Sequence, residues 1–154
     1  MIIAMEKKAV KKNIIKSCIE LLEKNIKTSK DRIQEIIQTA NDYEGDHDMF
    51  DPFKEDMMKK KDLQVKQMEK FLEDLKIVKM VDPERISDKV EFGAVIITDK
   101  QKMFVSAALG KITVDNESVY AISTQVPVYN AMKGLKIGDT FTINNNSFTI
   151  KDVF

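Results

Sequence analysis

The chain has 154 residues, which suffices for one ordinary domain or two small ones. Its 25 Lys and Arg residues balance its 25 Asp and Glu residues, and this zero net charge argues against simple non-specific nucleic-acid binding, which needs a basic surface. The first residues lack the order of a secretory signal, and no apolar run approaches the ~20 residues that span a bilayer. We therefore expect a cytoplasmic protein that does not bind membranes.

Residues 10–40 are predicted to form one long helix, because neither Pro nor Gly interrupts them. Its seam positions are spaced alternately by four and three, as in a coiled coil: Ile15, Ile19, Leu22, Ile26, Ser29, Ile33, Ile36 and Ala40. Further apolar residues widen the stripe, mostly near its ends, where a third element could pack: Ile14, Cys18, Leu21 and Ile37. Cys18, the only cysteine, is interpreted as a buried, reduced core residue, with a reactive thiol as the alternative.

A second helix is predicted over residues 52–79. The same spacing recurs at Met57, Lys61, Gln64, Met68, Phe71, Leu75 and Val78. Lys61 and Gln64 make the first half of this seam a poor core and leave the second half a good one. Asp51 followed by Pro52 favours a helix start, since Asp accepts hydrogen bonds from free backbone N–H groups and Pro suits the first helical position.

The two seams each cover about 25 residues, or roughly 38 Å of helix, and a short link joins them. They therefore predict an antiparallel helical hairpin. The link, "NDYEGDHDMFDP" at residues 41–52, contains no Lys or Arg, and its carboxylates are Asp42, Glu44, Asp46, Asp48 and Asp51. The hairpin is thus expected to carry an acidic tip.

The pattern changes after Asp82-Pro83, where the second helix should end. Period-two segments predict strands at 89–98, 102–109, 139–143 and 147–154, and the last two flank an Asn-rich tight turn. A short helix is predicted from Pro127, with Gly134 near its end and Gly138 in the turn that follows. The fold class is α+β: a coiled-coil hairpin at 1–81, a linker at 82–86, and a small antiparallel-sheet domain at 87–154.

Two C-terminal stretches resemble the bacterial transcription elongation factors GreA and GreB. "VEFGAVIIT" is similar to the opening strand of that family's C-terminal domain, and "ISTQVPVYNAMKGLKIGDTFTI" is similar to its later helix and strand. The matching positions are Ile122, Ser123, Pro127, Ala131, Met132, Gly134, Gly138 and Asp139. The resemblance implies an N-terminal coiled coil and an FKBP-like C-terminal domain.

The resemblance also implies a partner and a chemistry. In the family, the coiled coil enters the secondary channel of RNA polymerase, and its tip carboxylates help the polymerase hold Mg²⁺ and cleave backtracked RNA. The tip candidates are Glu44, Asp46, Asp48 and Asp51, and the docking candidates are Ser123, Gln125, Pro127 and Tyr129, of which Ser123, Gln125 and Tyr129 are expected to be exposed. On this basis we expect that the chain is not an enzyme itself and that it shares Mg²⁺ with the polymerase, without a cofactor of its own. We also expect it to contact nucleic acid only within the transcription complex and to be a monomer.

Three alternatives stay open because the sequence departs from the family at the tip. The family's tip motif, Asp-Leu-x-Glu-Asn-Ala-Glu-Tyr, is absent, and Met49 stands where a glutamate should follow Asp46. Asp48 and Asp51 have the required spacing of three, although Asp51 also has a structural role as a helix cap. The chain could be a cleavage factor, a regulator that occupies the channel without stimulating cleavage, or a coiled-coil module for another partner.

Overall fold

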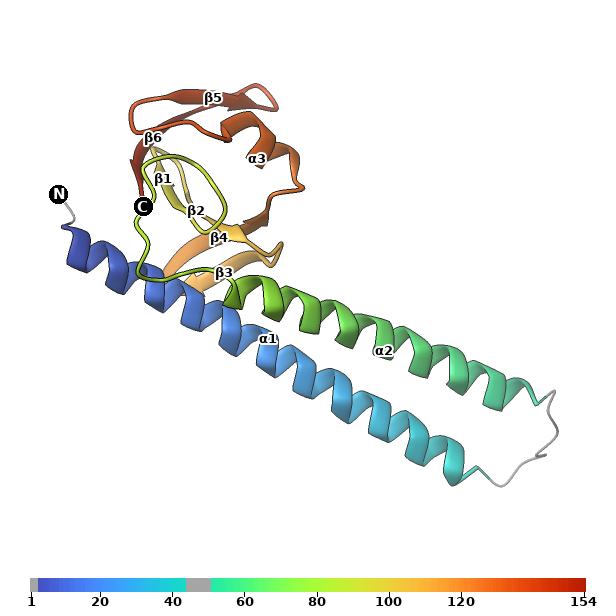
Figure 1. Ribbon diagram of the computed structural model, residues 1–154. Coiled ribbons are helices and arrows are strands. Elements are labelled where there is room, and N and C mark those ends of the chain that lie inside the picture. The colour runs from blue at the N-terminus through green and yellow to red at the C-terminus, as the bar shows by residue number, and fades with distance from the viewer. Residues whose placement is uncertain (1–2, 44–50) are drawn as a thin grey trace. The chain divides into compact units, whose positions relative to one another are not determined.

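The computed structural model describes residues 3–43 and 51–154 (Figure 1). The chain has the α+β architecture that the sequence predicts, with two long helices followed by a sheet and one short helix. It divides into two compact units. One comprises residues 21–74, and the other comprises the residues up to 20 together with 75–154.

The unit of residues 21–74 is a pair of antiparallel helical segments (Figure 1). They belong to α1 (Ala4–Asn41) and α2 (Pro52–Lys79), and α2 has the bounds that the sequence predicts. Leu22, Ile26 and Ser29 are buried on the α1 side. The predicted α2 seam positions in this unit are all half-buried: Met57, Lys61, Gln64, Met68 and Phe71. The seam is therefore where the sequence places it.

Polar groups weaken this seam along α2. Gln64 is half-buried, and its Oε1 has no hydrogen-bond partner among the described residues. Asp74 is almost fully buried and accepts a hydrogen bond at 3.3 Å from Lys70, four residues earlier. Burying a polar atom without a partner is unfavourable, so the helix pair gains less from this seam than an apolar seam would provide.

In the second unit, α1 starts six residues before the predicted position 10, at Ala4. The added turns are held by contacts with the C-terminal strand. Lys7 Nζ lies 3.1 Å from the Asp152 carboxylate and 5.7 Å from the centre of the Phe154 ring. These long-range contacts were invisible in the local sequence pattern.

The face of α1 that is buried in this unit also differs from the predicted seam. Ile14 and Cys18 are fully buried, whereas Ile15 and Ile19 are only half-buried. Ile14 lines a small cavity of about 90 Å³ together with Val114 of the sheet. The sheet is thus the third element that the widened stripe predicts, and it rotates the buried face of α1 by one residue.

The sheet has six strands in the order β3-β4-β2-β1-β6-β5. Their bounds are β1 Val95–Thr98, β2 Lys102–Ser106, β3 Gly110–Val114, β4 Glu117–Ser123, β5 Thr140–Ile143 and β6 Asn146–Val153. The sheet is antiparallel, as predicted, except at one pair: β2 and β4 run parallel, with Phe104 opposite Ala121. The reason is the position of β3, which forms the edge of the sheet instead of pairing with β2. β4 then lies between β3 and β2 and pairs with both.

Two strands were not predicted, and another is shorter than predicted. β3 and β4 form a hairpin closed by Asp115 and Asn116, both at positive φ, as two-residue hairpin turns require. Asn144 and Asn145 form the same kind of turn between β5 and β6, as predicted. β1 begins only at Val95, since Gly93 interrupts the extended backbone with a φ of +86°.

One face of the sheet packs against α3 (Pro127–Met132) around a buried apolar cluster. The cluster contains Val90, Ala94, Ile96, Met103, Val105, Tyr129, Met132, Phe141, Ile150 and Val153. Neighbouring residues of β1 and β2 are buried on both faces, as in Val95 and Ile96. The central strands are therefore the most enclosed part of this unit.

Lys11 is an unusual member of the core because its side chain is almost fully buried. Its Nζ donates a hydrogen bond of 2.8 Å to the backbone carbonyl of Arg85. Burial is the main cause that lowers the pKa of this amine to about 8, and the Arg85 charge adds to the effect. The contact ties the first turns of α1 to the segment between α2 and the sheet.

Replacing Ile150 by Ala should destabilise the sheet unit by about 2–5 kcal/mol, because the change leaves a cavity in the buried cluster. Urea unfolding followed by circular dichroism measures this loss. Ile137→Ala is the matched control, since Ile137 is 58% exposed and its truncation should change the unfolding free energy by no more than about 0.5 kcal/mol. Equal losses in the two variants would contradict the assigned core.

The buried amine of Lys11 predicts a pH dependence of stability. Between pH about 8 and 10.5 the unfolded chain binds more protons at this position than the folded chain, so the unfolding free energy rises with pH. Lys11→Met removes the titrating group and retains most of the side-chain volume. The difference in unfolding free energy, wild type minus Lys11→Met, should therefore increase across this window in urea titrations. A constant or falling difference would show that Lys11 titrates normally.

Candidate functional site

The candidate site lies where α1 and α2 are joined. At this end the ring of Tyr43, after α1, stacks on the ring of Phe53, in the first turn of α2, with 4.1 Å between centroids. Asp42 accepts hydrogen bonds from the Gln38 side-chain amide at 3.0 Å. The stacked rings bring the ends of the two helices together. This pair was not predicted from the sequence, although an aromatic residue near each end of the acidic link was a readable signal.

Asp51 is committed to the start of α2. Its Oδ1 accepts a hydrogen bond of 2.9 Å from the Phe53 backbone N–H, and Pro52 occupies the first helical position. The Asp51 side chain is nearly buried, and its Oδ2 has no hydrogen-bond partner among the described residues. The structural alternative for Asp51, a helix cap, is therefore confirmed. A carboxylate fixed in this way is poorly placed to serve a partner.

The other three tip candidates, Glu44, Asp46 and Asp48, lie outside the described residues. Within residues 3–43 and 51–154, no cluster of three or more His, Cys, Asp or Glu side chains could hold a metal ion. In the same ranges, no helix is long and apolar enough to cross a membrane.

The four predicted docking residues surround the start of α3 but are not equally accessible. Gln125 and Pro127 are exposed, and Ser123 is half-buried, with its Oγ accepting a hydrogen bond from the Gln125 backbone N–H. The prediction that Tyr129 is exposed is wrong, because its ring is part of the buried cluster beneath α3. The first turn of α3 directs position 129 toward the sheet, so Tyr129 is a core residue.

Cys18 is completely buried, as predicted. Burial raises the pKa of its thiol to about 12, so the thiolate needed for nucleophilic or metal chemistry does not form near neutral pH. The reactive-thiol alternative therefore has no support.

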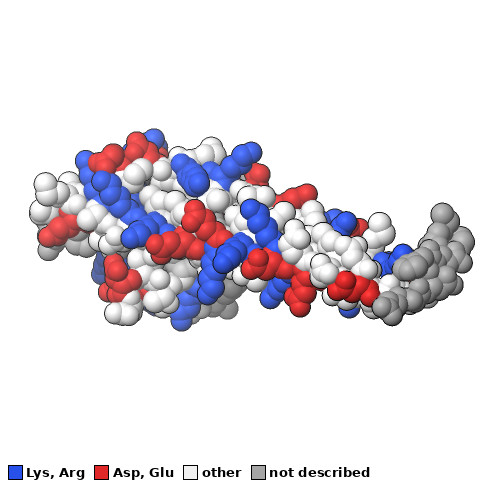
Figure 2. Space-filling model, turned by 90° about the horizontal axis from the view of Figure 1, so that it is seen from below, with Lys and Arg blue, Asp and Glu red and all other residues white. Residues whose placement is uncertain are grey.

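The helices carry a mixed-charge surface. Positive and negative side chains alternate over the face drawn in Figure 2. Several lysines pair with acidic residues four positions away, such as Lys59 with Glu55 at 3.5 Å and Lys60 with Asp56 at 3.4 Å. Such pairs are typical of a solvated helix and contribute little individually to stability.

Comparison with protein-family models finds no match, and comparison with curated proteins finds none either. The solved structures that are similar to the chain include two of Gfh1. A crystal structure of GreA factor homolog 1 (Gfh1) of Thermus thermophilus is 16% identical, with 90% of this chain and 96% of that chain covered and a TM-score of 0.37. A structure of the transcription factor Gfh1 is 17% identical, with 90% and 94% covered and a TM-score of 0.38.

Proposed function

We propose that the chain binds bacterial RNA polymerase and inserts its helical hairpin into the secondary channel. The observation that carries this proposal is an antiparallel helix pair whose ends are joined by an acidic segment. The stacked rings of Tyr43 and Phe53 hold these ends together. The segment of α1 from Leu21 to Asn41 is roughly 30 Å long at about 1.5 Å per residue, which suits a narrow channel. The Gre-like motifs of the C-terminal half support the same partner, with Gln125 and Pro127 as exposed docking residues.

In this proposal the acidic segment assists the polymerase in cleaving backtracked RNA. Mg²⁺ prefers oxygen ligands and retains several waters, so one or two carboxylates from a partner can complete its site. A second metal held about 3.5–4 Å from the first stabilises the attacking and leaving oxygens. We assign this role to Asp46 and Asp48, with Glu44 beside them. The chain itself acts as a monomer and supplies no nucleophile or cofactor of its own.

A second candidate function is occupation of the channel without cleavage, and the geometry of Asp51 favours it. Asp48 and Asp51 are the pair that reproduces the family's carboxylate spacing, yet Oδ1 of Asp51 is bound to the Phe53 N–H and the side chain is nearly buried. A tip with only part of its carboxylate set can fill a channel and exclude substrate without completing a metal site. The two functions differ in what they do to the RNA of a backtracked complex: the first shortens its 3′ end and the second does not.

Added to backtracked elongation complexes of a matching bacterial polymerase, the protein should shorten the 3′ end of the RNA, because its carboxylates complete the second metal site. Asp46→Asn combined with Asp48→Asn should abolish the shortening and leave polymerase binding intact, as measured by gel analysis of labelled RNA and by co-sedimentation. Slower RNA synthesis without shortening would select the second function. Failure to bind polymerase would exclude both.

Asp51 variants separate the cap from metal chemistry. Asn caps helices about as well as Asp but carries no charge, so Asp51→Asn should retain both stability and cleavage. Asp51→Ala removes the cap and should lower the unfolding free energy by about 1 kcal/mol in urea titrations. Loss of cleavage in a stably folded Asp51→Asn variant would instead place this carboxylate in the metal site.

A further inference from the structure

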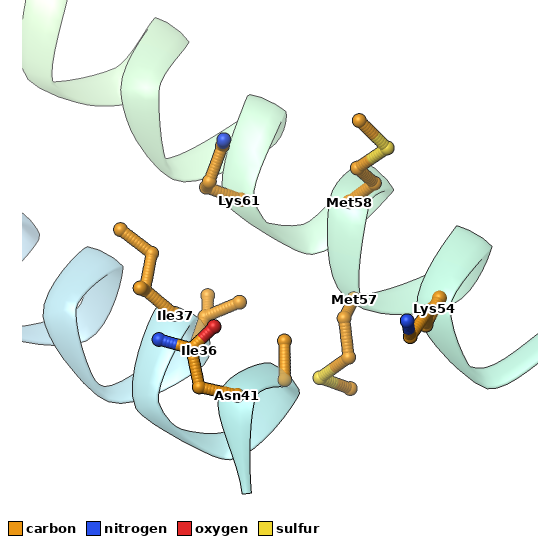
Figure 3. Close-up of a pocket in the computed structure, with 8 residues that line it drawn as sticks. Ile36, Ile37, Asn41, Lys54, Met57, Met58 and Lys61 are labelled. Atoms are coloured by element: carbon orange, nitrogen blue, oxygen red, sulfur yellow. The ribbon is translucent and has the colours of Figure 1, made fainter. Parts of the chain in front are cut away.

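A groove runs between α1 and α2 in the part of the helix pair that adjoins the acidic segment (Figure 3). It has a volume of about 320 Å³, at the lower end of the range for binding clefts. Ile36 and Ile37 project from α1 toward α2, and Met57 projects from α2 toward α1 (Figure 3). The floor of the groove is therefore aliphatic and thioether surface.

Apolar side chains remain open to water along this groove. Met58 is 63% exposed and Ile37 is 37% exposed, and both line the groove. Exposed apolar surface gathered in a concave site, rather than scattered singly, is typical of an interaction site. Methionine also adapts its shape to different partners, because its side chain is unbranched and polarisable.

The charged side chains that line this groove are both lysines. Lys54 and Lys61 line it, and neither makes an ion pair with any described residue. Their neighbours Lys59 and Lys60, which do not line it, are paired with Glu55 and Asp56. None of the described residues that line the groove is acidic. Within the described part of the chain, the site thus combines an apolar floor with two lysines that make no ion pair.

We propose that this groove binds an acidic amphipathic helix of a partner protein. Apolar residues of that helix, spaced by three and four, would lie on the methionine and isoleucine floor, and its carboxylates would pair with Lys54 and Lys61. A third helix also fits the composition of the seam, which is weakest at Lys61 and Gln64. The inference does not depend on the proposed function, since it rests on described residues of α1 and α2 and not on the tip carboxylates.

A synthetic peptide tests the proposal directly. The probe is a capped helical peptide with Leu and one Trp on one face and Glu on the other, and because the protein contains no Trp, peptide fluorescence reports binding alone. Saturable binding is expected, weakened by salt, whereas the same peptide with Lys in place of Glu should not bind. Saturable binding of the Lys peptide with equal affinity, or no binding of the Glu peptide, would overturn the proposal.

Matched variants locate the binding site. The double variant Lys54→Gln, Lys61→Gln should bind the Glu peptide about five- to tenfold more weakly than the wild type. The double variant Lys59→Gln, Lys60→Gln makes the same charge change outside the groove, and its affinity for the Glu peptide should stay within about twofold of the wild-type value. Met58→Gln should weaken binding similarly, but Leu63→Gln, at a comparably exposed position elsewhere on α2, should not.

Equal effects of the groove variants and their controls would contradict the proposed site. A dimer detected by sedimentation and dissociated by Met58→Gln would identify the occupant as a second copy of the chain and would likewise overturn the proposal.

Discussion

The attachment of the first turns of α1 to the sheet unit is the constraint from which the rest of this unit follows. Lys11 hydrogen-bonds the Arg85 carbonyl, and Lys7 pairs with Asp152 of the last strand. A buried amine is unfavourable unless it is hydrogen-bonded, so the Arg85 carbonyl must remain where α1 meets it. This fixes the segment that leads into β1, and it accounts for the burial of Ile14 and Cys18 rather than of their seam neighbours.

The two long helices were predictable because their signals are local. Asp51 and Pro52 marked the start of α2 correctly, and an uninterrupted apolar period marked most of α1. The extra turns of α1 depend on the ion pair of Lys7 with Asp152, which lies 145 positions away and is contained in no local pattern. β3 was missed for a related reason: it is a short edge strand with little apolar alternation, closed by an Asp-Asn turn that reads equally well as a loop.

The candidate site was only partly predictable because the same residue type serves two purposes at the join between the helices. Five carboxylates lie in the link, and a helix start requires one acceptor for its free N–H groups, which Asp51 supplies, as the following Pro52 indicated. The prediction for Tyr129 was wrong, since its position beside exposed Gln125 and Pro127 suggested a contact residue, whereas the first turn of α3 directs it into the core. In both cases helix geometry decided the role of the side chain.

The weak seam of α2 has consequences beyond stability. A coiled coil gains most when its seam is apolar, but α2 places Lys61 and Gln64 there and leaves Met58 exposed beside them. The polar seam leaves a groove lined by Lys54 and Lys61, and neither lysine makes an ion pair with a described residue. Apolar side chains are exposed beside these lysines. An acidic partner helix would match both features, because it would cover the apolar floor and neutralise both lysines in a single contact.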